Sequence, residues 1–159
     1  MRAAVLTVSD GVARGERQDE SGGVLEELLT ADGYEVVRRV VPDERSEIAS
    51  AIEELTEAAE LVLTTGGTGV APRDVTPEAT ASVLERQIPG IAEAIRADAA
   101  ARTPHGLLSR GVAGVRSAAL VVNLPGSPGG CRDGFAVMRE ALPHALRLLA
   151  GEQGGHRQT

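Results

Sequence analysis

The chain has 159 residues, a formal net charge of −7 and one cysteine, and its sixteen cationic side chains are all arginine. Without lysine, a Schiff-base lysine, a lysine general base and the phosphate-binding lysine of a Walker A loop are impossible, and one cysteine excludes an internal disulfide. The acidic balance and an aromatic content of 1% argue against nucleic-acid binding, and no apolar run approaches the roughly 20 residues of a membrane span. We therefore expect a cytoplasmic protein that binds neither nucleic acid nor membrane.

Apolar runs with β-branched residues alternate with stretches of helical periodicity along most of the chain. Continuous runs such as AAVLTV indicate strands buried on both faces, whereas leucines three and four residues apart indicate helices. The first part of the chain predicts, in order, a strand over 3–8, a loop over 9–21, a helix over 22–32, a strand over 34–41, a helix capped by Ser46 and a strand over 61–65. The rest predicts a helix capped by Thr76, a helix over 91–101, a strand pair within 111–124 turning at Arg116-Ser117, and a last helix ending near Ala150.

This alternation of strands and helices is typical of right-handed βαβ units. It predicts an α/β fold of three layers, α/β/α, with a mostly parallel sheet and one short antiparallel strand. No internal repeat or long linker divides the chain, so we assign residues 1–150 to one domain. The polar, glycine-rich residues 151–159 are predicted to form a frayed C-terminal tail.

Polar or glycine-rich loops follow four of the predicted strands. In an open parallel sheet, ligands bind at the carboxyl ends of the strands, where such loops meet. The segments that this rule selects are Ser9-Asp10-Gly11, Pro42-Asp43, Gly66 to Asp74, and Asn123 to Gly130.

The loop TTGGTG (64–69) contains three glycines in four residues. Such a loop lets backbone N–H groups converge on a phosphate, as in an anion-binding nest. It matches neither the dinucleotide fingerprint nor the Walker A pattern. A tight turn after the strand, without any ligand, explains the glycines equally well.

Two aspartates follow predicted strands near this loop. Asp74, in PRDVTPE (72–78), either caps the next helix or, if Thr76 is the cap, is available to face the glycine loop. Asp43 is either a turn residue or a second carboxylate of the same site. Two carboxylates beside a phosphate nest are what a magnesium ion bridging phosphate oxygens requires. Arg73 either neutralises phosphate charge or is solvated.

The segment NLPGS (123–127) is the second candidate ligand loop. Its Pro-Gly pair sets a sharp turn, and Ser127 lies near the start of the last predicted helix, where backbone N–H groups attract anions. Ser109, in LLSR (107–110), either donates to a ligand or begins a turn. Cys131 is interpreted as a small buried residue rather than a nucleophile, because no histidine or asparagine is spaced to activate it.

TTGGTG, PRDVTPEAT, LSR and NLPGSP, in this order, resemble the molybdenum-cofactor biosynthesis family, and the likeness runs from VSD (8–10) to the last helix. The resemblance implies a molybdopterin-binding α/β/α fold and a homotrimer or hexamer. It also implies Mg-ATP-dependent adenylylation of molybdopterin, in which the terminal phosphate of molybdopterin attacks the α-phosphorus of ATP and releases pyrophosphate. Other proteins of the cofactor pathway are its implied partners.

Carried over by position, the family's two functional aspartates are Asp43 and Asp74, which we predict to be catalytic and to bind Mg²⁺. The segment 19–22 lies on the nucleotide side by resemblance. Together, the loops and the resemblance predict that substrates are bound by Ser9, Asp10, Gly66, Gly67, Thr68, Gly69, Arg73, Ser109, Asn123, Pro125, Gly126 and Ser127.

The segment PGSPGGCR (125–132) looks closer to the protein B branch of the family, some of whose members are thought to bind pterin without turnover. PRDVTPEAT, in contrast, is shared with catalytic members, and both aspartates are retained. We therefore predict a molybdopterin adenylyltransferase. The alternatives are a non-catalytic molybdopterin-binding or carrier protein and, as a third, a generic nucleotide-binding α/β protein.

Overall fold

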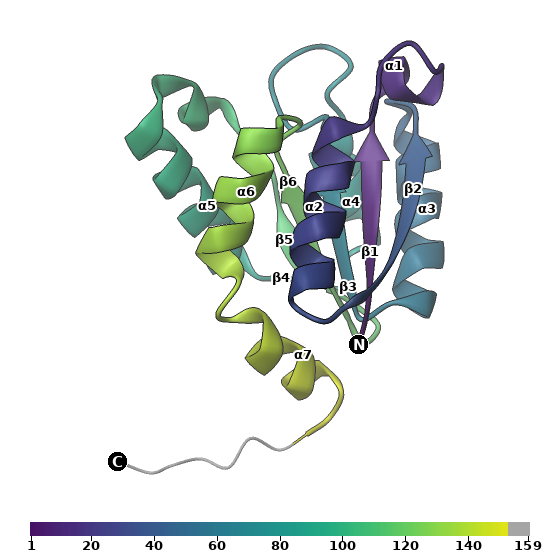
Figure 1. Cartoon of the computed structure of the whole chain (residues 1–159), viewed down its shortest axis with the longest axis vertical. Helices are drawn as coiled ribbons and strands as arrows, with labels where there is room; N and C mark the ends of the chain where they lie inside the picture. Colours follow the sequence, from purple (N-terminus) through teal and green to yellow (C-terminus); the bar gives the residue numbers. More distant parts are fainter. Residues whose placement is uncertain (153–159) are drawn as a thin grey trace.

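A six-stranded sheet runs through the middle of the computed structural model, which describes residues 1–152 (Figure 1). In the order β2-β1-β3-β6-β5-β4, the first four strands are parallel, and β5 is antiparallel to both of its neighbours. This confirms the predicted α/β class and its one antiparallel strand. The strands are β1 (Arg2–Val8), β2 (Glu35–Val41), β3 (Leu61–Thr65), β4 (Arg86–Gln87), β5 (Ala113–Arg116) and β6 (Ala119–Leu124).

Helices cover both faces of this sheet, so the predicted three layers are present (Figure 1). One face carries α2 and α6, with α5 beside α6, and the other carries α3 and α4. The helices are α1 (Asp10–Ala13), α2 (Glu20–Ala31), α3 (Arg45–Ala58), α4 (Thr76–Val83), α5 (Pro89–Arg102), the 3₁₀ helix η1 (Pro104–Leu108), α6 (Pro128–Met138) and α7 (Leu142–Leu149). Within the described residues, none of them is long and apolar enough to cross a membrane.

The central strands are buried along almost their whole length because each contributes to two cores. Along β1, Val5 packs in the cluster under α2 and α6, whereas Leu6 packs in the cluster under α3 and α4. Both side chains are fully buried. Alternate side chains of a strand point to opposite faces, so a strand covered on both sides is apolar at most successive positions. The exceptions in β3 and β6 are the buried polar residues Thr64, Thr65 and Asn123 near the carboxyl ends of the strands.

Several predicted boundaries are wrong for local reasons. The segment predicted as a loop over 9–21 contains the single-turn helix α1, capped by Ser9, and the start of α2, capped by Asp19. Ser46 is not a cap, because α3 begins at Arg45 after Glu44.

The predicted last helix is two helices, α6 and α7. Pro143 explains the break, because its ring removes one backbone hydrogen bond and collides with the carbonyl group four residues before it. The strands β5 and β6 turn at Ser117, which has a φ of 53°. The short elements β4 and η1 were not predicted. Residues 153–159 of the predicted tail lie outside the described residues.

Candidate functional site

The loops after β1, β2, β3 and β6 meet at one edge of the sheet, as the sequence predicts. Two of them are tied together by their aspartates: the N–H of Asp10 donates to Asp43 Oδ2 (2.8 Å), and the N–H of Asp43 donates to Asp10 Oδ1 (3.0 Å). The other two are joined where the N–H of Gly66 donates to the carbonyl of Leu124 (3.2 Å). Residues far apart in sequence thus form one continuous surface.

All four carbonyl oxygens of the glycine loop (residues 66–69) accept hydrogen bonds from other parts of the chain. Thr76 on α4 donates to two of them, and Arg110 donates to the other two. The four bonds are Thr76 Oγ1 to Gly66 (2.9 Å), Thr76 N to Gly67 (3.1 Å), Arg110 N to Thr68 (2.8 Å) and Arg110 Nε to Gly69 (2.8 Å). Thr76 therefore holds the glycine loop rather than capping α4, whose N-cap is Val75.

The backbone N–H groups of Gly67, Thr68 and Gly69 show the opposite pattern. No acceptor within residues 1–152 binds any of the three. Gly67, Thr68 and Gly69 line the two cavities, so their three N–H groups are available to bind an anion there. This geometry favours the phosphate nest over a plain tight turn.

Glycine is required at two positions of this loop. Gly66 and Gly67 have φ values of 99° and 68°, in the left-handed region that side chains with a Cβ disfavour. A Cβ on Gly66 would collide with the carbonyl oxygen of Val8, and one on Gly67 would collide with Thr76 Oγ1. The loop therefore approaches β1 and α4 too closely for any larger residue.

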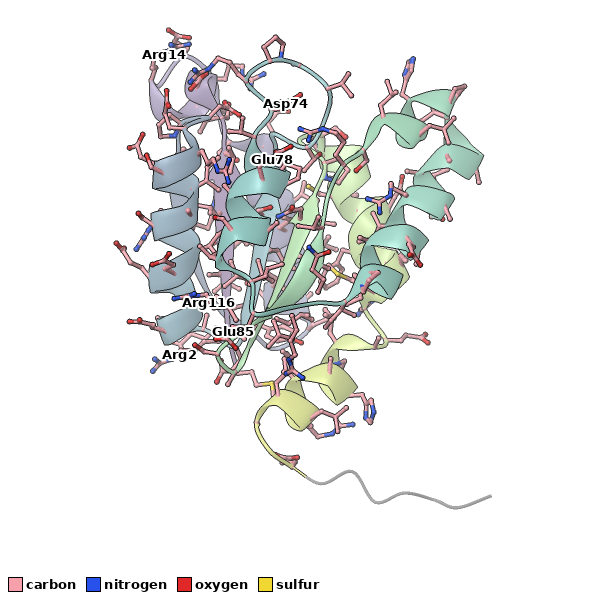
Figure 2. The ribbon with its side chains drawn as sticks, turned by 180° about the vertical axis from the view of Figure 1, so that it is seen from behind. Arg2, Arg14, Asp74, Glu78, Glu85 and Arg116 are labelled. Carbon is pink, nitrogen blue, oxygen red and sulfur yellow. The ribbon has the colours of Figure 1, made fainter. Side chains whose placement is uncertain are left out.

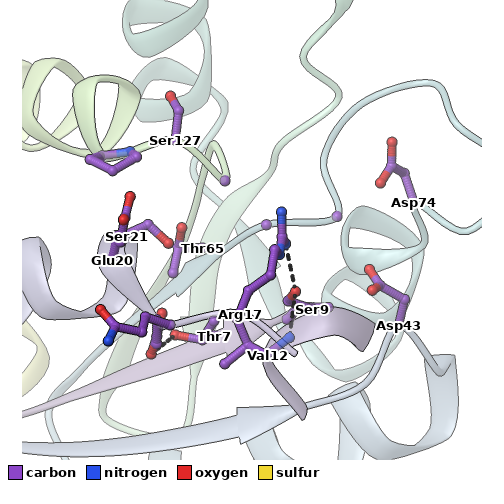
Figure 3. Close-up of a pocket in the computed structure, with 17 residues that line it drawn as sticks. Thr7, Ser9, Val12, Arg17, Glu20, Ser21, Asp43, Thr65, Asp74 and Ser127 are labelled. Carbon is purple, nitrogen blue, oxygen red and sulfur yellow. Dashed lines mark hydrogen bonds between the residues drawn. The ribbon is translucent and has the colours of Figure 1, made fainter. Parts of the chain in front are cut away.

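A cavity of about 770 Å³ opens beside the glycine loop (Figure 3). Four carboxylates line it, together with hydroxyl groups from Thr7, Ser9, Thr65 and others, and Arg17 is its one cationic side chain among the described residues. The carboxylates belong to Asp19, Glu20, Asp43 and Asp74.

Asp43 and Asp74 lie on the same side of this cavity, next to the glycine loop (Figure 3). Burial raises the pKa of Asp43, and the negative charges of Asp10 and Asp74 raise it further. A divalent cation between the two carboxylates would relieve this repulsion. The described residues contain no group of three potential metal ligands. Mg²⁺ is commonly held by only one or two carboxylates together with substrate phosphates, so the pair fits that ion.

Asp74 also closes its own loop. Its Oδ2 accepts the N–H of Ala71 (3.0 Å), and its N–H donates to the carbonyl of Ala71 (2.9 Å). The carboxylate does not cap α4, so the interpretation that it faces the glycine loop is the one that the structure supports. A Cβ on Gly69 would come within 2.9 Å of Asp74 Oδ2, which shows how close the two lie.

Arg73 ties the loop that carries Asp74 to two other segments. It donates to Asp10 Oδ2 (2.7 Å) and to Glu44 Oε1 (3.0 Å). The hydrogen bond from Arg73, together with that from the N–H of Asp43, lowers the pKa of Asp10 to about 2. Neither Arg73 nor Asp10 lines the cavity, and their hydrogen bonds join the three loops to one another. Their predicted contact with substrate stays a prediction.

Replacing Arg73 by glutamine is expected to raise the pKa of Asp10 from about 2 toward the ordinary value of 3.8. Because the folded-state pKa is lowered, ionised Asp10 stabilises the fold above about pH 4, and this contribution is lost as the pH falls toward 2. Titration of the Asp10 carboxyl carbon by NMR in both proteins measures the shift. An unchanged midpoint would show that Arg73 does not bind Asp10 in solution.

A second cavity of about 630 Å³ adjoins the first. The two cavities have Gly67, Asp74, Gly126 and Ser127 in common, so the glycine loop and the turn after β6 lie between them. Apolar side chains such as Ile95 and Leu108 line the second cavity. Its polar lining includes Thr68, Ser109, Asp98, Arg102, His105 and Asp133.

Helix α6 begins at the boundary between the two cavities. Ser127 caps it by accepting the N–H of Gly130 (3.0 Å). The preceding turn is fixed at the carbonyl of Pro125, which accepts hydrogen bonds from Thr65 Oγ1 (2.7 Å) and Cys131 Sγ (3.2 Å). Burial raises the pKa of the Cys131 thiol to about 11, which agrees with its interpretation as a buried, unreactive residue.

Asn123 does not line either cavity. Its amide group donates to Thr64 Oγ1 (2.9 Å) and Thr80 Oγ1 (3.0 Å), and it accepts the N–H of Val112 (3.1 Å). The side chain is 4% exposed and joins β6 to β3 and α4. In the structure Asn123 is therefore a buried residue that links neighbouring elements by hydrogen bonds, whereas the sequence predicts a ligand contact.

The other predicted substrate-binding residues do line the cavities. They divide into residues of the first cavity (Ser9, Gly66), residues of the second (Thr68, Gly69, Ser109, Pro125) and residues of both (Gly67, Gly126, Ser127). The segment predicted on the nucleotide side contributes Asp19, Glu20 and Ser21 to the first cavity.

Residues 4–144 match a family model described as "Probable molybdopterin binding domain". The chain belongs to this molybdopterin-binding family. Among its relatives, the molybdopterin adenylyltransferase of Helicobacter pylori is 36% identical over 92% of this chain and 86% of its own length. The molybdenum cofactor synthesis protein cinnamon of Drosophila melanogaster is 38% identical over 98% of this chain, which spans about a quarter (26%) of that protein.

Solved structures of the molybdopterin-binding family share this fold. The molybdopterin biosynthesis enzyme MoaB of Thermus thermophilus superimposes with a TM-score of 0.88 and is 47% identical, covering 94% of this chain and 96% of its own. The predicted membership of the molybdenum-cofactor biosynthesis family is therefore confirmed.

Two arginines of this molybdopterin-binding domain were missed in the sequence. Arg17 lines the first cavity and donates to Ser9 Oγ (2.9 Å). Arg110 binds the glycine loop from behind. Arg17 follows no strand, so the rule that selects strand ends does not find it. Arg110 belongs to the LSR motif and follows Ser109, a predicted ligand residue. This neighbouring position is the one feature of the sequence that could have pointed to it.

Proposed function

We propose that the chain transfers the adenylyl group of ATP to the terminal phosphate of molybdopterin, giving adenylyl-molybdopterin and pyrophosphate. One observation carries the proposal: three successive N–H groups that have no acceptor within residues 1–152 lie between two cavities and beside two carboxylates. Support comes from the relatives named molybdopterin adenylyltransferase, which match this chain over most of its length.

The two cavities suit the two substrates. Both have volumes typical of small-molecule sites. The first, with Arg17, many hydroxyl groups and the two carboxylates proposed to hold Mg²⁺, suits Mg-ATP. The second, with the apolar wall of Ile95 and Leu108 beside Ser109, suits the pterin. The phosphate of one substrate and the α-phosphate of the other would then meet at the glycine loop that lies between the cavities.

Asp43 and Asp74 would hold Mg²⁺, which, when bound, neutralises phosphate charge. The remaining work falls to the protein's own groups, because nucleotidyl transfer needs positioning and charge stabilisation more than covalent chemistry by side chains. The N–H groups of residues 67–69 would bind phosphate oxygens, and those at the start of α6 would add to them. Neither a lysine nor an activated cysteine is required.

The proposal is tested by incubating the protein with molybdopterin and Mg-ATP and measuring pyrophosphate and adenylyl-molybdopterin. We expect both products in equal amounts, and no turnover above an Asp74→Ala control would contradict catalysis. A carrier protein of the same fold would bind pterin without forming product. Calorimetry separates the two functions, because saturable, magnesium-dependent binding of ATP is expected for the enzyme alone. The homotrimer or hexamer, the pathway partners and the cytoplasmic location stay predictions.

Replacing Arg17 by alanine is expected to raise KM for ATP about tenfold with little change in kcat, because a charge-assisted hydrogen bond to a phosphate is lost in ground state and transition state alike. Arg14→Ala is the matched control, since Arg14 lies on the same exposed segment, pairs with Glu16 and does not line the cavity. Steady-state kinetics with varied ATP measures both. Equal effects of the two substitutions would remove Arg17 from the site.

A further inference from the structure

We propose that Arg110 is a positioning residue of the anion site, which fixes the direction of the glycine-loop carbonyl groups so that the N–H groups remain available to phosphate. The inference rests on the proposed function, since it assumes that phosphate binds at residues 67–69. It assigns a role to a side chain that does not itself line either cavity.

Arg110 contacts the glycine loop and the Asp74 loop at the same time. Its N–H donates to the carbonyl of Thr68 (2.8 Å), and its guanidinium donates from Nε to Gly69 (2.8 Å) and from Nη2 to the carbonyl of Asp74 (2.7 Å). The third guanidinium nitrogen, Nη1, donates to Glu78 on α4. One half-buried side chain therefore joins the proposed phosphate nest, a proposed metal ligand and a helix.

These contacts determine whether the glycine loop turns carbonyl oxygens or N–H groups toward a bound anion. A carbonyl oxygen turned toward the cavity would repel phosphate, whereas the N–H groups attract it. Arg110 binds the carbonyl groups at both ends of the segment 69–74, so these dipoles cannot rotate toward a ligand. The charge of Arg110 is paired with that of Glu78, so its remaining influence on an anion passes through these backbone groups.

Lysine cannot replace this geometry. The guanidinium presents planar, fixed donors, and here three separate nitrogens bind acceptors on three different residues. The ammonium group of lysine has the same charge but is a single donor atom. Arg110→Lys therefore keeps the charge and removes the simultaneous contacts.

Glu78→Gln separates two explanations, because a role in positioning Arg110 and a purely electrostatic role predict opposite effects on anion binding. Removing a negative charge near the site strengthens anion binding if only charge matters. If Glu78 acts by holding the Arg110 guanidinium, the same change weakens anion binding. Arg116→Gln is the matched control, because Arg116 also donates to a backbone carbonyl, that of Val83 (3.1 Å). Figure 2 shows Arg116 near the end of the molecule opposite Asp74.

The experiment is calorimetric titration of each full-length variant with inorganic pyrophosphate in the presence of Mg²⁺, below the unfolding temperature of every variant. We expect Arg110→Lys to raise Kd at least about tenfold and Glu78→Gln to raise it about threefold. Arg116→Gln is expected to leave Kd within about twofold of the wild-type value. The Arg110→Lys, Glu78→Gln double variant is expected to bind no more weakly than Arg110→Lys alone, because both changes remove one arrangement.

Wild-type Kd values for Arg110→Lys, or tighter binding by Glu78→Gln, would overturn the proposal and leave the proposed function intact. Equal weakening by Arg110→Lys and Arg116→Gln would also overturn it, since a general loss of stability then explains both. If the wild-type protein binds no pyrophosphate, the proposed function fails and the role of Arg110 fails with it. Should Arg110→Lys not fold, the direction of the Glu78→Gln effect decides.

Discussion

Replacing Asp74 by asparagine is expected to lower kcat for adenylyl transfer by a factor of about 10² to 10³, while Kd for molybdopterin stays within about threefold. Asparagine retains an oxygen that can accept the N–H of Ala71, so the loop is preserved and only the charge is lost. A proposed metal ligand thus disappears while the pterin loop at residues 125–127 is untouched. Rapid-quench measurement of product and a separate binding titration with molybdopterin give the two quantities.

The matched control for Asp74 is Asp32→Asn. Asp32 follows α2, is paired with Arg139 and does not line either cavity, so the control removes a carboxylate without altering the site. Its kcat is expected to equal that of the wild-type protein. A kcat for Asp74→Asn within threefold of the wild-type value would exclude Asp74 as a metal ligand needed for turnover.

Replacing Gly66 by alanine is expected to lower the free energy of unfolding by more than about 2 kcal/mol and to abolish pyrophosphate binding. The residue has a φ of 99°, and an added Cβ meets the carbonyl oxygen of Val8, which belongs to the buried strand β1 and cannot move aside. Relief would require displacement of the glycine loop. Chemical denaturation and calorimetry measure the two effects.

Gly90→Ala is the matched control for this substitution. Gly90 lies in the first turn of α5, and a Cβ there meets nothing within 4 Å. Alanine in a helix is expected to leave stability unchanged or to raise it by about 0.4–1 kcal/mol. An equally stable, pyrophosphate-binding Gly66→Ala protein would show that the close approach to β1 is not required.

The sequence predicts the fold well because the order of apolar and polar residues follows the pattern of burial in the structure. Apolar runs over 3–8 and 61–65 coincide with strands that are buried on both faces. The βαβ connections make these strands parallel, so the loops with Asp43 and Asp74 lie at the same edge of the sheet. Short elements such as α1 were missed, since four residues carry no measurable periodicity.

The hydrogen-bond partners of charged side chains in the site were less predictable, because several partners are possible for each. Arg73 binds Asp10 and Glu44, a choice made by tertiary contacts that no local pattern encodes. Asn123, in contrast, was predictable in principle. It follows Val121 by two residues, Val121 packs under α3 and α4, and a strand of period two places Asn123 on that same face, where Thr80 binds it.

Adenylyl transfer is proposed to occur at the glycine loop between the two cavities. Incubation with molybdopterin and ATP labelled at the α-phosphate, in the presence of Mg²⁺, tests it most directly. Label is expected to enter adenylyl-molybdopterin in step with the release of pyrophosphate, and Asp74→Asn is expected to form almost no labelled product. Unlabelled molybdopterin, recovered bound to a wild-type protein that has been saturated with labelled ATP, would contradict it.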